Sequence, residues 1–227
     1  MKKKEQLRSG LQKGILSIIP ALLAIVLTHC AGPATGARDS ANDHHAFSGR
    51  HLSEWIDLTA KSVQVPPAAE DAALVYDSHR HRMILFGGKN DADENMNETW
   101  AFSFETHTWE KLPVKGEIPP PSEDHVCIYD PENDQLILHG GEDGDTRNIL
   151  FSLDLKQLQW HDLTDTLSPW LENHTAIYNS VMKSMVVFGG ETDGISNNEV
   201  WALNLNARSG DYLKWRLLPR GKKAPRP

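Results

Sequence analysis

The feature that most constrains this fold is a sequence repeat of about fifty residues. Three segments align without gaps: AALVYDSHRHRMILFGG (72–88), HVCIYDPENDQLILHGG (125–141) and HTAIYNSVMKSMVVFGG (174–190). In each, a tyrosine lies eleven residues before a Gly-Gly pair, and the pairs recur 53 and then 49 residues apart. A period of this length predicts similar supersecondary units that pack side by side.

Large aromatic residues repeat in the downstream half of each unit. One follows the second glycine by 10 to 12 residues, and a tryptophan closes the unit nine residues later, or fourteen later in the third unit, where RSGDY predicts a hairpin insertion. The first set is Trp100, Phe151 and Trp201, and the closing set, with one copy ahead of the repeats, is Trp55, Trp109, Trp160 and Trp215.

Each unit contains four short runs with strand composition. In the first unit they are 73–77, 83–86, 99–104 and 108–112, rich in Val, Ile, Tyr, Phe and Trp and separated by turn residues. No helical periodicity is found past residue 30. Four antiparallel strands repeated at this period are typical of the blades of an all-β propeller.

The paired glycines, the following aromatic and the spaced tryptophan resemble kelch repeats, which belong to the galactose-oxidase-like propeller superfamily. The resemblance covers residues 51–227 and implies blade units at 66–113, 119–163 and 168–219, with 51–58 as the closing strand of a preceding blade and 220–227 as the start of a further one. Three blades do not close a ring, so we expect an incomplete propeller that needs further blades or another copy. Kelch units commonly carry an arginine three residues before the first-strand histidine, but Ser122 and Leu171 stand there. Arginine ties between blades are therefore not expected.

The repeated residues have structural explanations. Glycine permits positive φ and close backbone approach, and a side chain at the pair is expected to strike the neighbouring blade. The tryptophans are expected to pack between blades. The glycines concerned are Gly87, Gly88, Gly140, Gly141, Gly189 and Gly190.

The N-terminus has the composition of a secretory signal. A basic stretch precedes an apolar run over 15–27 that is too short to cross a bilayer, and small residues follow. We interpret 1–29 as a signal peptide with a signal helix, and the polar residues 30–50 as a flexible tether. Cys30 resembles the lipidated cysteine of a bacterial lipobox, although His29 departs from that pattern. Plain cleavage, lipidation and a retained signal anchor stay open, and all three predict an exported chain, either periplasmic, an outer-membrane lipoprotein or extracellular.

The charge balance limits the partners. The net charge is −8, and removal of 1–29 leaves 18 basic and 30 acidic residues, a net charge of −12. Nucleic acid is therefore not an expected partner.

The loops after the Gly-Gly pairs are acidic and are predicted to form a negative rim for a partner. Asp91 and Asp93 resemble the start of a calcium loop, but Met96 and Phe102 occupy its required Gly and Glu positions. His79 and His81 could share a metal, yet a solvated turn is favoured. No cofactor motif occurs, so we predict neither a cofactor nor a catalytic residue. The rim residues are Asp91, Asp93, Glu142, Asp143, Asp145, Glu191 and Asp193.

Three functional hypotheses remain. The resemblance favours a non-catalytic binding module for a protein or carbohydrate. The second is an exported propeller enzyme, similar to sialic-acid mutarotases or to galactose oxidase, and the third is a truncated fragment without its own activity. A copper oxidase would need converging Tyr and His ligands, whereas the repeat-equivalent positions of Tyr76, Tyr129 and Tyr178 indicate packing.

Overall fold

The computed structural model describes residues 56–58 and 61–219. The chain divides into two units, Met1–Asp57 and Leu58–Pro227, and the architecture below belongs to the second. The described residues form strands and turns and no helix, so the expected all-β class is confirmed for them. None of the described segments is a helix able to span a bilayer. The signal helix, Cys30, the tether, Trp55 and 220–227 lie outside the described residues, while 56–58 are not in a strand.

Three sheets follow one another, each with four antiparallel strands and the middle one with a short fifth strand, and we call them the first, second and third blades. The first blade contains β1 (Ala73–Asp77), β2 (Arg82–Phe86), β3 (Thr99–Ser103) and β4 (Thr108–Lys111). The second contains β6 (Val126–Asp130), β7 (Gln135–His139), β8 (Leu150–Asp154) and β9 (Gln159–Asp162). The third contains β10 (Thr175–Asn179), β11 (Ser184–Phe188), β14 (Val200–Asn204) and β15 (Trp215–Leu217).

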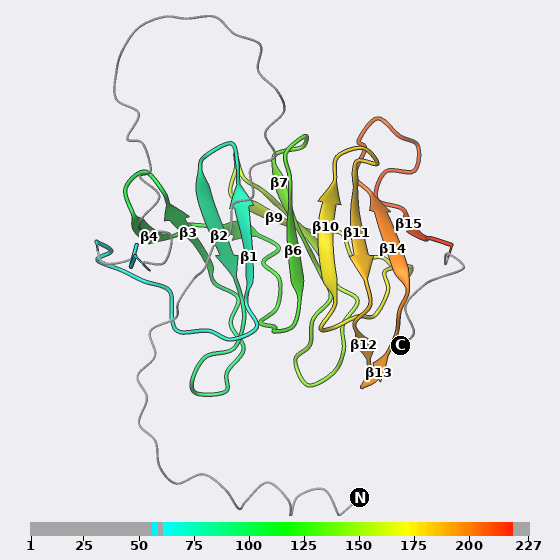
Figure 1. The fold of residues 1–227 in the computed structure, drawn as a ribbon, viewed down its shortest axis with the longest axis horizontal. Coiled ribbons are helices and arrows are strands. Elements are labelled where there is room, and N and C mark those ends of the chain that lie inside the picture. The colour runs from blue at the N-terminus through cyan, green and yellow to red at the C-terminus, as the bar shows by residue number, and fades with distance from the viewer. Residues whose placement is uncertain (1–55, 59–60, 220–227) are drawn as a thin grey trace, which may run out of the picture. The chain divides into compact units, whose positions relative to one another are not determined.

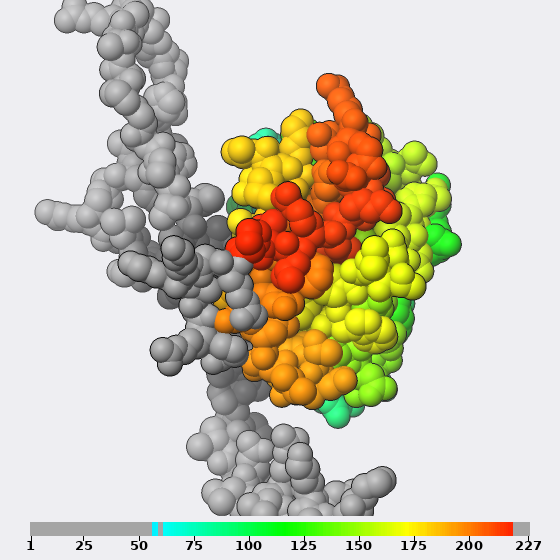
Figure 2. All heavy atoms as spheres, turned by 90° about the vertical axis from the view of Figure 1, so that its right-hand side faces the viewer, coloured from blue at the N-terminus to red at the C-terminus, as the bar shows by residue number. Residues whose placement is uncertain are grey.

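The blades pack like those of a propeller. In each sheet the strands lie in chain order, and the first strands β1, β6 and β10 are neighbours (Figure 1). The fourth strands therefore lie farthest from the first strands, and in the second sheet the short fifth strand lies outside β9. Figure 2 shows the third blade, in yellow, orange and red, packed against the yellow-green second blade.

Short segments outside the four-strand pattern complete the sheets. β5 (Lys115–Gly116) pairs in parallel with β9, and β12 (Glu191–Thr192) and β13 (Ile195–Ser196) form a hairpin. At the first blade, the Ser62 Oγ accepts a hydrogen bond from the Trp109 N–H at the equivalent outer edge, 2.9 Å away.

Two apolar clusters fill the spaces between blades. On β7, Leu136 and Leu138 pack with Ile84 and Phe86 of the first blade, while Ile137 packs with the third blade. This alternation follows from the period of two along a strand. We call the face of a blade toward its predecessor the leading face and the face toward its successor the trailing face.

The closing tryptophans occupy equivalent leading-face positions with different surroundings. Trp160 is fully buried, its ring 5.1 Å from that of Phe86, and the Trp215 ring lies 4.7 Å from that of His139. Trp109 is only half-buried and packs on Phe102 of its own sheet, 5.2 Å away. It was expected to close a blade interface. The structure differs because no described blade precedes the first.

The first glycine of each Gly-Gly pair also has different surroundings in the three blades. A Cβ at Gly87 would lie 2.7 Å from the His125 ring, and one at Gly140 would lie 2.2 Å from the Leu171 carbonyl oxygen, both in the next blade. At Gly189 the nearest atom is the Asn197 carbonyl oxygen of its own blade, 3.7 Å away. The second glycines are crowded by their own blade instead, as at Gly141, 2.6 Å from the Glu123 carbonyl oxygen.

The expected hairpin insertion in the third unit is different in the structure. Residues 207–213 form consecutive turns without strands of their own. They lengthen the β14–β15 connection and close it through the Leu213 N–H, which donates to the Asn204 carbonyl.

Candidate functional site

The loops after β2, β7 and β11 lie at one end of the sheets, where the first strands begin. We define this loop rim as residues 87–98, 140–149 and 189–199, together with the segments that lead into the first strands, 66–72, 117–125 and 164–174. The rim therefore combines surface from three consecutive blades (Figure 1).

Hydrogen bonds between loops make the rim continuous. The Asn95 amide donates to the Asp143 carboxylate at 3.3 Å, which joins the first loop to the second. The Asp193 N–H donates to the Thr146 Oγ at 3.0 Å, which joins the third loop to the second. A partner would therefore meet a surface whose parts are already positioned.

The acidic residues predicted for the rim fall into two groups, half-buried and exposed. Glu142 and Glu191 are half-buried because their backbones bridge to Glu123 and Glu172. The exposed members are Asp91, Asp93, Asp143, Asp145 and Asp193.

Two large apolar side chains are also exposed on the rim. Trp170 is 53% exposed and Ile195 is 74% exposed. The Thr192 hydroxyl donates to the Trp170 carbonyl at 2.5 Å, and Thr192 pairs with Ile195 across the β12–β13 hairpin. The hairpin thus carries Ile195 and fixes the backbone at Trp170.

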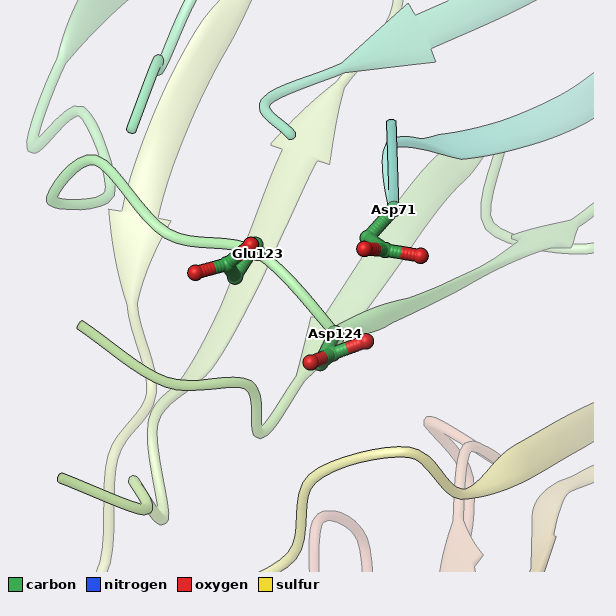
Figure 3. Close-up of side chains that lie close together, drawn as sticks. All are labelled: Asp71, Glu123 and Asp124. Carbon is green, nitrogen blue, oxygen red and sulfur yellow. The ribbon is translucent and has the colours of Figure 1, made fainter. Parts of the chain in front are cut away.

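A second group of carboxylates lies in the rim segments that lead into β1 and β6. Oxygens of Asp71, Glu123 and Asp124 lie within 4.8 Å of one another (Figure 3). Burial and then the neighbouring Asp71, Glu123 and Glu142 raise the pKa of Asp124 to about 6. These oxygens are of the type that Ca²⁺ prefers. However, the Lys89 ammonium already lies 2.7 Å from Glu123, so a protein cation balances part of the charge.

Glu172 occupies the position in the third blade that Glu123 occupies in the second. It is 6% exposed, and its pKa is raised by burial and by Glu142 and Glu191. Asp71, Asp124 and Asn173 share a positive φ near 55°, which directs the backbone similarly in the three blades.

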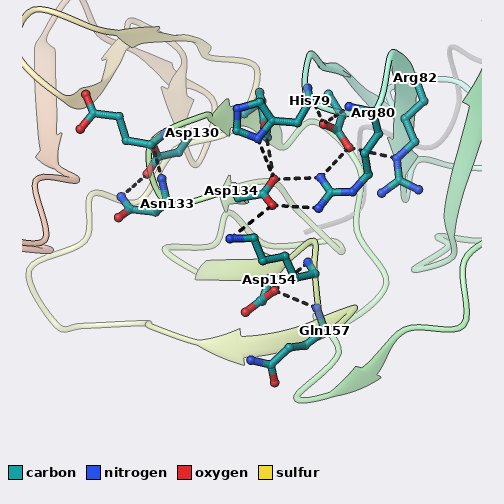
Figure 4. A network of polar contacts seen from close by, with 12 residues as sticks. His79, Arg80, Arg82, Asp130, Asn133, Asp134, Asp154 and Gln157 are labelled. Carbon is teal, nitrogen blue, oxygen red and sulfur yellow. Dashed lines mark hydrogen bonds and ion pairs between the residues drawn. The ribbon is translucent and has the colours of Figure 1, made fainter.

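The opposite end of the blades contains a polar tie between the first two. Arg80 donates from both terminal nitrogens to the two Asp134 oxygens at 2.8 Å each, and Asp77 accepts a further bond from Arg80 (Figure 4). The hydrogen bonds from Arg80 lower the pKa of Asp134 to about 2. An arginine tie does exist here, although it comes from a turn and not from the position usual in kelch units.

The two histidines of the first turn do not form the metal site that was the less favoured reading of the sequence. His79 Nδ1 lies 3.4 Å from Asp134, whereas His81 Nδ1 lies 2.9 Å from the Tyr76 hydroxyl. Each ring therefore has its own partner and the two share no metal position. Tyr129 donates to Asp134 at 3.2 Å, so the hydroxyls of Tyr76 and Tyr129 both contact turn residues. Cys127 is a free thiol on β6 whose pKa is raised by burial.

Buried imidazoles join the blades near the glycine pairs. His125 Nε2 donates to the Phe86 carbonyl at 3.2 Å. His139 Nε2 donates to the Pro169 carbonyl at 3.1 Å, so its Nδ1 accepts from His174 Nε2 at 3.1 Å. Burial lowers the pKa of His125 and of His174 to about 4 and holds both rings neutral.

Sequence reasoning identified the acidic loops but missed three features. The carboxylate group was readable from the Glu-Asp pairs that precede two of the repeated strands. The Arg80–Asp134 tie was readable only by aligning turns, because its partners are 54 residues apart. Trp170 is the one tryptophan outside the two repeated aromatic positions, but nothing in the sequence indicated that its side chain is exposed.

Comparison with known proteins agrees with this geometry. Residues 29–130 and 77–227 match the KLHDC2/KLHL20/DRC7 Kelch-repeats domain. Over 115 residues, the chain is 30% identical to dynein regulatory complex subunit 7 of Chlamydomonas reinhardtii, covering 49% of this chain and 10% of that protein.

Two further relatives match more of the chain. Kelch domain-containing protein 3 of Bos taurus is 27% identical over 207 residues, covering 80% of this chain and 52% of that protein. F-box/kelch-repeat protein At1g51550 of Arabidopsis thaliana is 32% identical over 206 residues, covering 76% and 42%. The chain thus spans about half the length of these relatives or less. On the matched domain and the three blades, it belongs to the kelch-repeat family.

Proposed function

We propose that this chain is a non-catalytic protein-binding module and that its loop rim receives the partner. The observation that carries the proposal is the exposure of Trp170 and Ile195 on a rim that also has five exposed aspartates. Exposed aromatic anchors with a charged surround are typical of protein interfaces.

The partner expected from this chemistry is a basic peptide segment with an apolar or aromatic side chain. The exposed aspartates would attract the cationic groups, and Trp170 would contact the apolar group or stack on an arginine. Kelch domains in the relatives named above support a module of this kind. A carbohydrate ligand is the competing outcome.

Selection from a displayed library of random peptides tests the proposal. We expect recovered peptides to be enriched in Lys, Arg and aromatic residues, and to bind less tightly as salt rises. Trp170→Ala should weaken their binding at least tenfold. Leu217→Ala, at a 48% exposed position on β15, is the matched control and should bind normally. Peptides that bind the Trp170→Ala and Leu217→Ala chains equally would contradict the proposal, as would binding to a glycan array alone.

We also infer that the chain acts outside the cytoplasm, because its first 29 residues have the composition of an export signal. Cell fractionation with mass spectrometry of the N-terminus checks this. A diacylglyceryl Cys30 would establish a lipoprotein, and a cytoplasmic chain that keeps Met1 would refute export.

A further inference from the structure

The trailing faces of the first two blades are covered in a repeated way. Phe86 and Ile128 are buried by the next blade, at 1% and 4% exposure. The N–H groups of Gly88 and Gly141 donate to the Ser122 and Leu171 carbonyls of the next blade, at 3.0 and 2.9 Å. The same blade also fills the space next to Gly87 and Gly140.

The trailing face of the third blade carries the same features without a cover. Ile177, equivalent to Ile128, is 60% exposed, and Phe188, equivalent to Phe86, is 38% exposed. The space next to Gly189 is open. Within the described part of the chain, the Gly190 N–H has no backbone carbonyl as an acceptor. The face therefore continues an established interface of this molecule.

The complementary face occurs at the other side of the described blades. Leu85, Phe104 and Trp109 on the leading face of the first blade are half-buried. Their equivalents in the second blade, Leu138, Leu155 and Trp160, are 0–3% exposed under the first blade.

We propose that the trailing face of the third blade binds the leading face of the first blade in a second copy of this chain. Applied reciprocally, this head-to-tail contact joins two sets of three blades into a closed ring of six with twofold symmetry. Six blades lie within the usual range of propellers.

The contact would cover the open groups of the trailing face, but it lacks one side chain that is present between the other blades. The carbonyl of Ala69, the equivalent of Ser122 and Leu171, would accept the Gly190 N–H, and it has no backbone donor among the described residues. Ala72 stands where His125 and His174 stand in the other blades, so this contact lacks the imidazole. At the end of the blades opposite the rim, Val181 and Met182 of one copy would face His81 of the other copy. Two uncharged side chains would therefore meet the imidazole, and no like charges would come together.

Sedimentation velocity of the purified chain tests the proposal. We expect the mass of a dimer, and a twofold fall to the monomer mass in Ile177→Asp. The matched control is Ile195→Asp, which is 74% exposed on the rim and should remain a dimer. A monomeric natural chain, or a dimer that survives Ile177→Asp, would overturn the proposal. Peptide binding depends on Trp170 and not on Ile177, so failure here leaves the proposed function separately testable.

Mixing two variants tests the head-to-tail arrangement. Leu85→Asp damages the leading face and Ile177→Asp the trailing face, and each alone should be a folded monomer by circular dichroism. Their mixture should regain dimers through one intact interface, since each supplies the face that the other lacks. A mixture that stays monomeric while both chains are folded would refute this arrangement.

Discussion

Gly140 has a φ of +69°, and the Leu171 carbonyl of the next blade lies where its Cβ would be. Gly140→Ala should therefore add a steric clash to backbone strain, at a total cost of about 3–5 kcal/mol. Gly194→Ala is the control, because Gly194 has a φ of +75° with no atom near its Cβ position. It should cost only about 1–2 kcal/mol. Urea unfolding of both variants measures the difference, and equal losses would mean that strain alone explains the glycine.

The buried histidines make stability depend on pH. Burial lowers the pKa of His125 and His174 to about 4, against 6.5 in the unfolded chain, so the unfolded state binds more protons between these values. Their contribution is complete above pH 6.5 and is lost as pH falls toward 4, by roughly 2–3 kcal/mol for each ring. Asp124 acts in the opposite direction, because its raised pKa favours the folded state as pH falls from about 6 to 4. Urea midpoints from pH 7.5 to 4.5 should fall less steeply in His174→Gln than in the natural chain. His161→Gln at an exposed position should leave the slope unchanged.

Among the strands, the closing tryptophans provide a matched comparison between interfaces. Trp160→Ala empties a site between two blades and should cost about 3–5 kcal/mol. In the monomeric Ile177→Asp chain, Trp109→Ala removes a half-buried ring from a face that no neighbouring blade covers, and should cost about 1–2 kcal/mol. Thermal melts compare the two tryptophan changes in that background. If Trp109→Ala is as damaging there as Trp160→Ala, something other than the proposed second copy covers the first leading face.

The strands themselves were predictable from the repeat. The four runs of the first unit match β1 to β4 to within one residue at each end, because alternation and turn residues are local signals. The surroundings of each strand were not predictable. Trp109 and Trp160 are equivalent in sequence, and only the presence of a neighbouring blade separates a half-buried ring from a buried one.

Within a single copy of the chain, the second blade should be the most protected. It packs on both faces, and Leu136, Ile137 and Leu138 on β7 are all fully buried. In the monomeric Ile177→Asp chain, hydrogen exchange should therefore be slowest in β6–β8 and faster in β1 and β10. Slowest exchange in the third blade would contradict this order.

The candidate site, too, could be predicted from the sequence only in part. The acidic loops could be predicted because each belongs to one unit. The rim itself depends on contacts between units, such as Asn95 with Asp143 and Thr146 with Asp193, and the sequence spacing does not specify them.

The two-residue strand β5 has a consequence for how the array assembles. Lys115 and Gly116 follow the last strand of the first blade, yet they pair with Gln159 and Trp160 of the second. The outermost strand of the second sheet therefore comes from a segment that precedes that blade in the sequence. Loop closure over this separation delays that pairing until the intervening strands have formed. A chain emerging from the ribosome would hold this short segment unpaired until the whole second blade has been made. A cut placed at the apparent blade boundary, after Gly116, would leave the second blade with an open edge prone to intermolecular pairing.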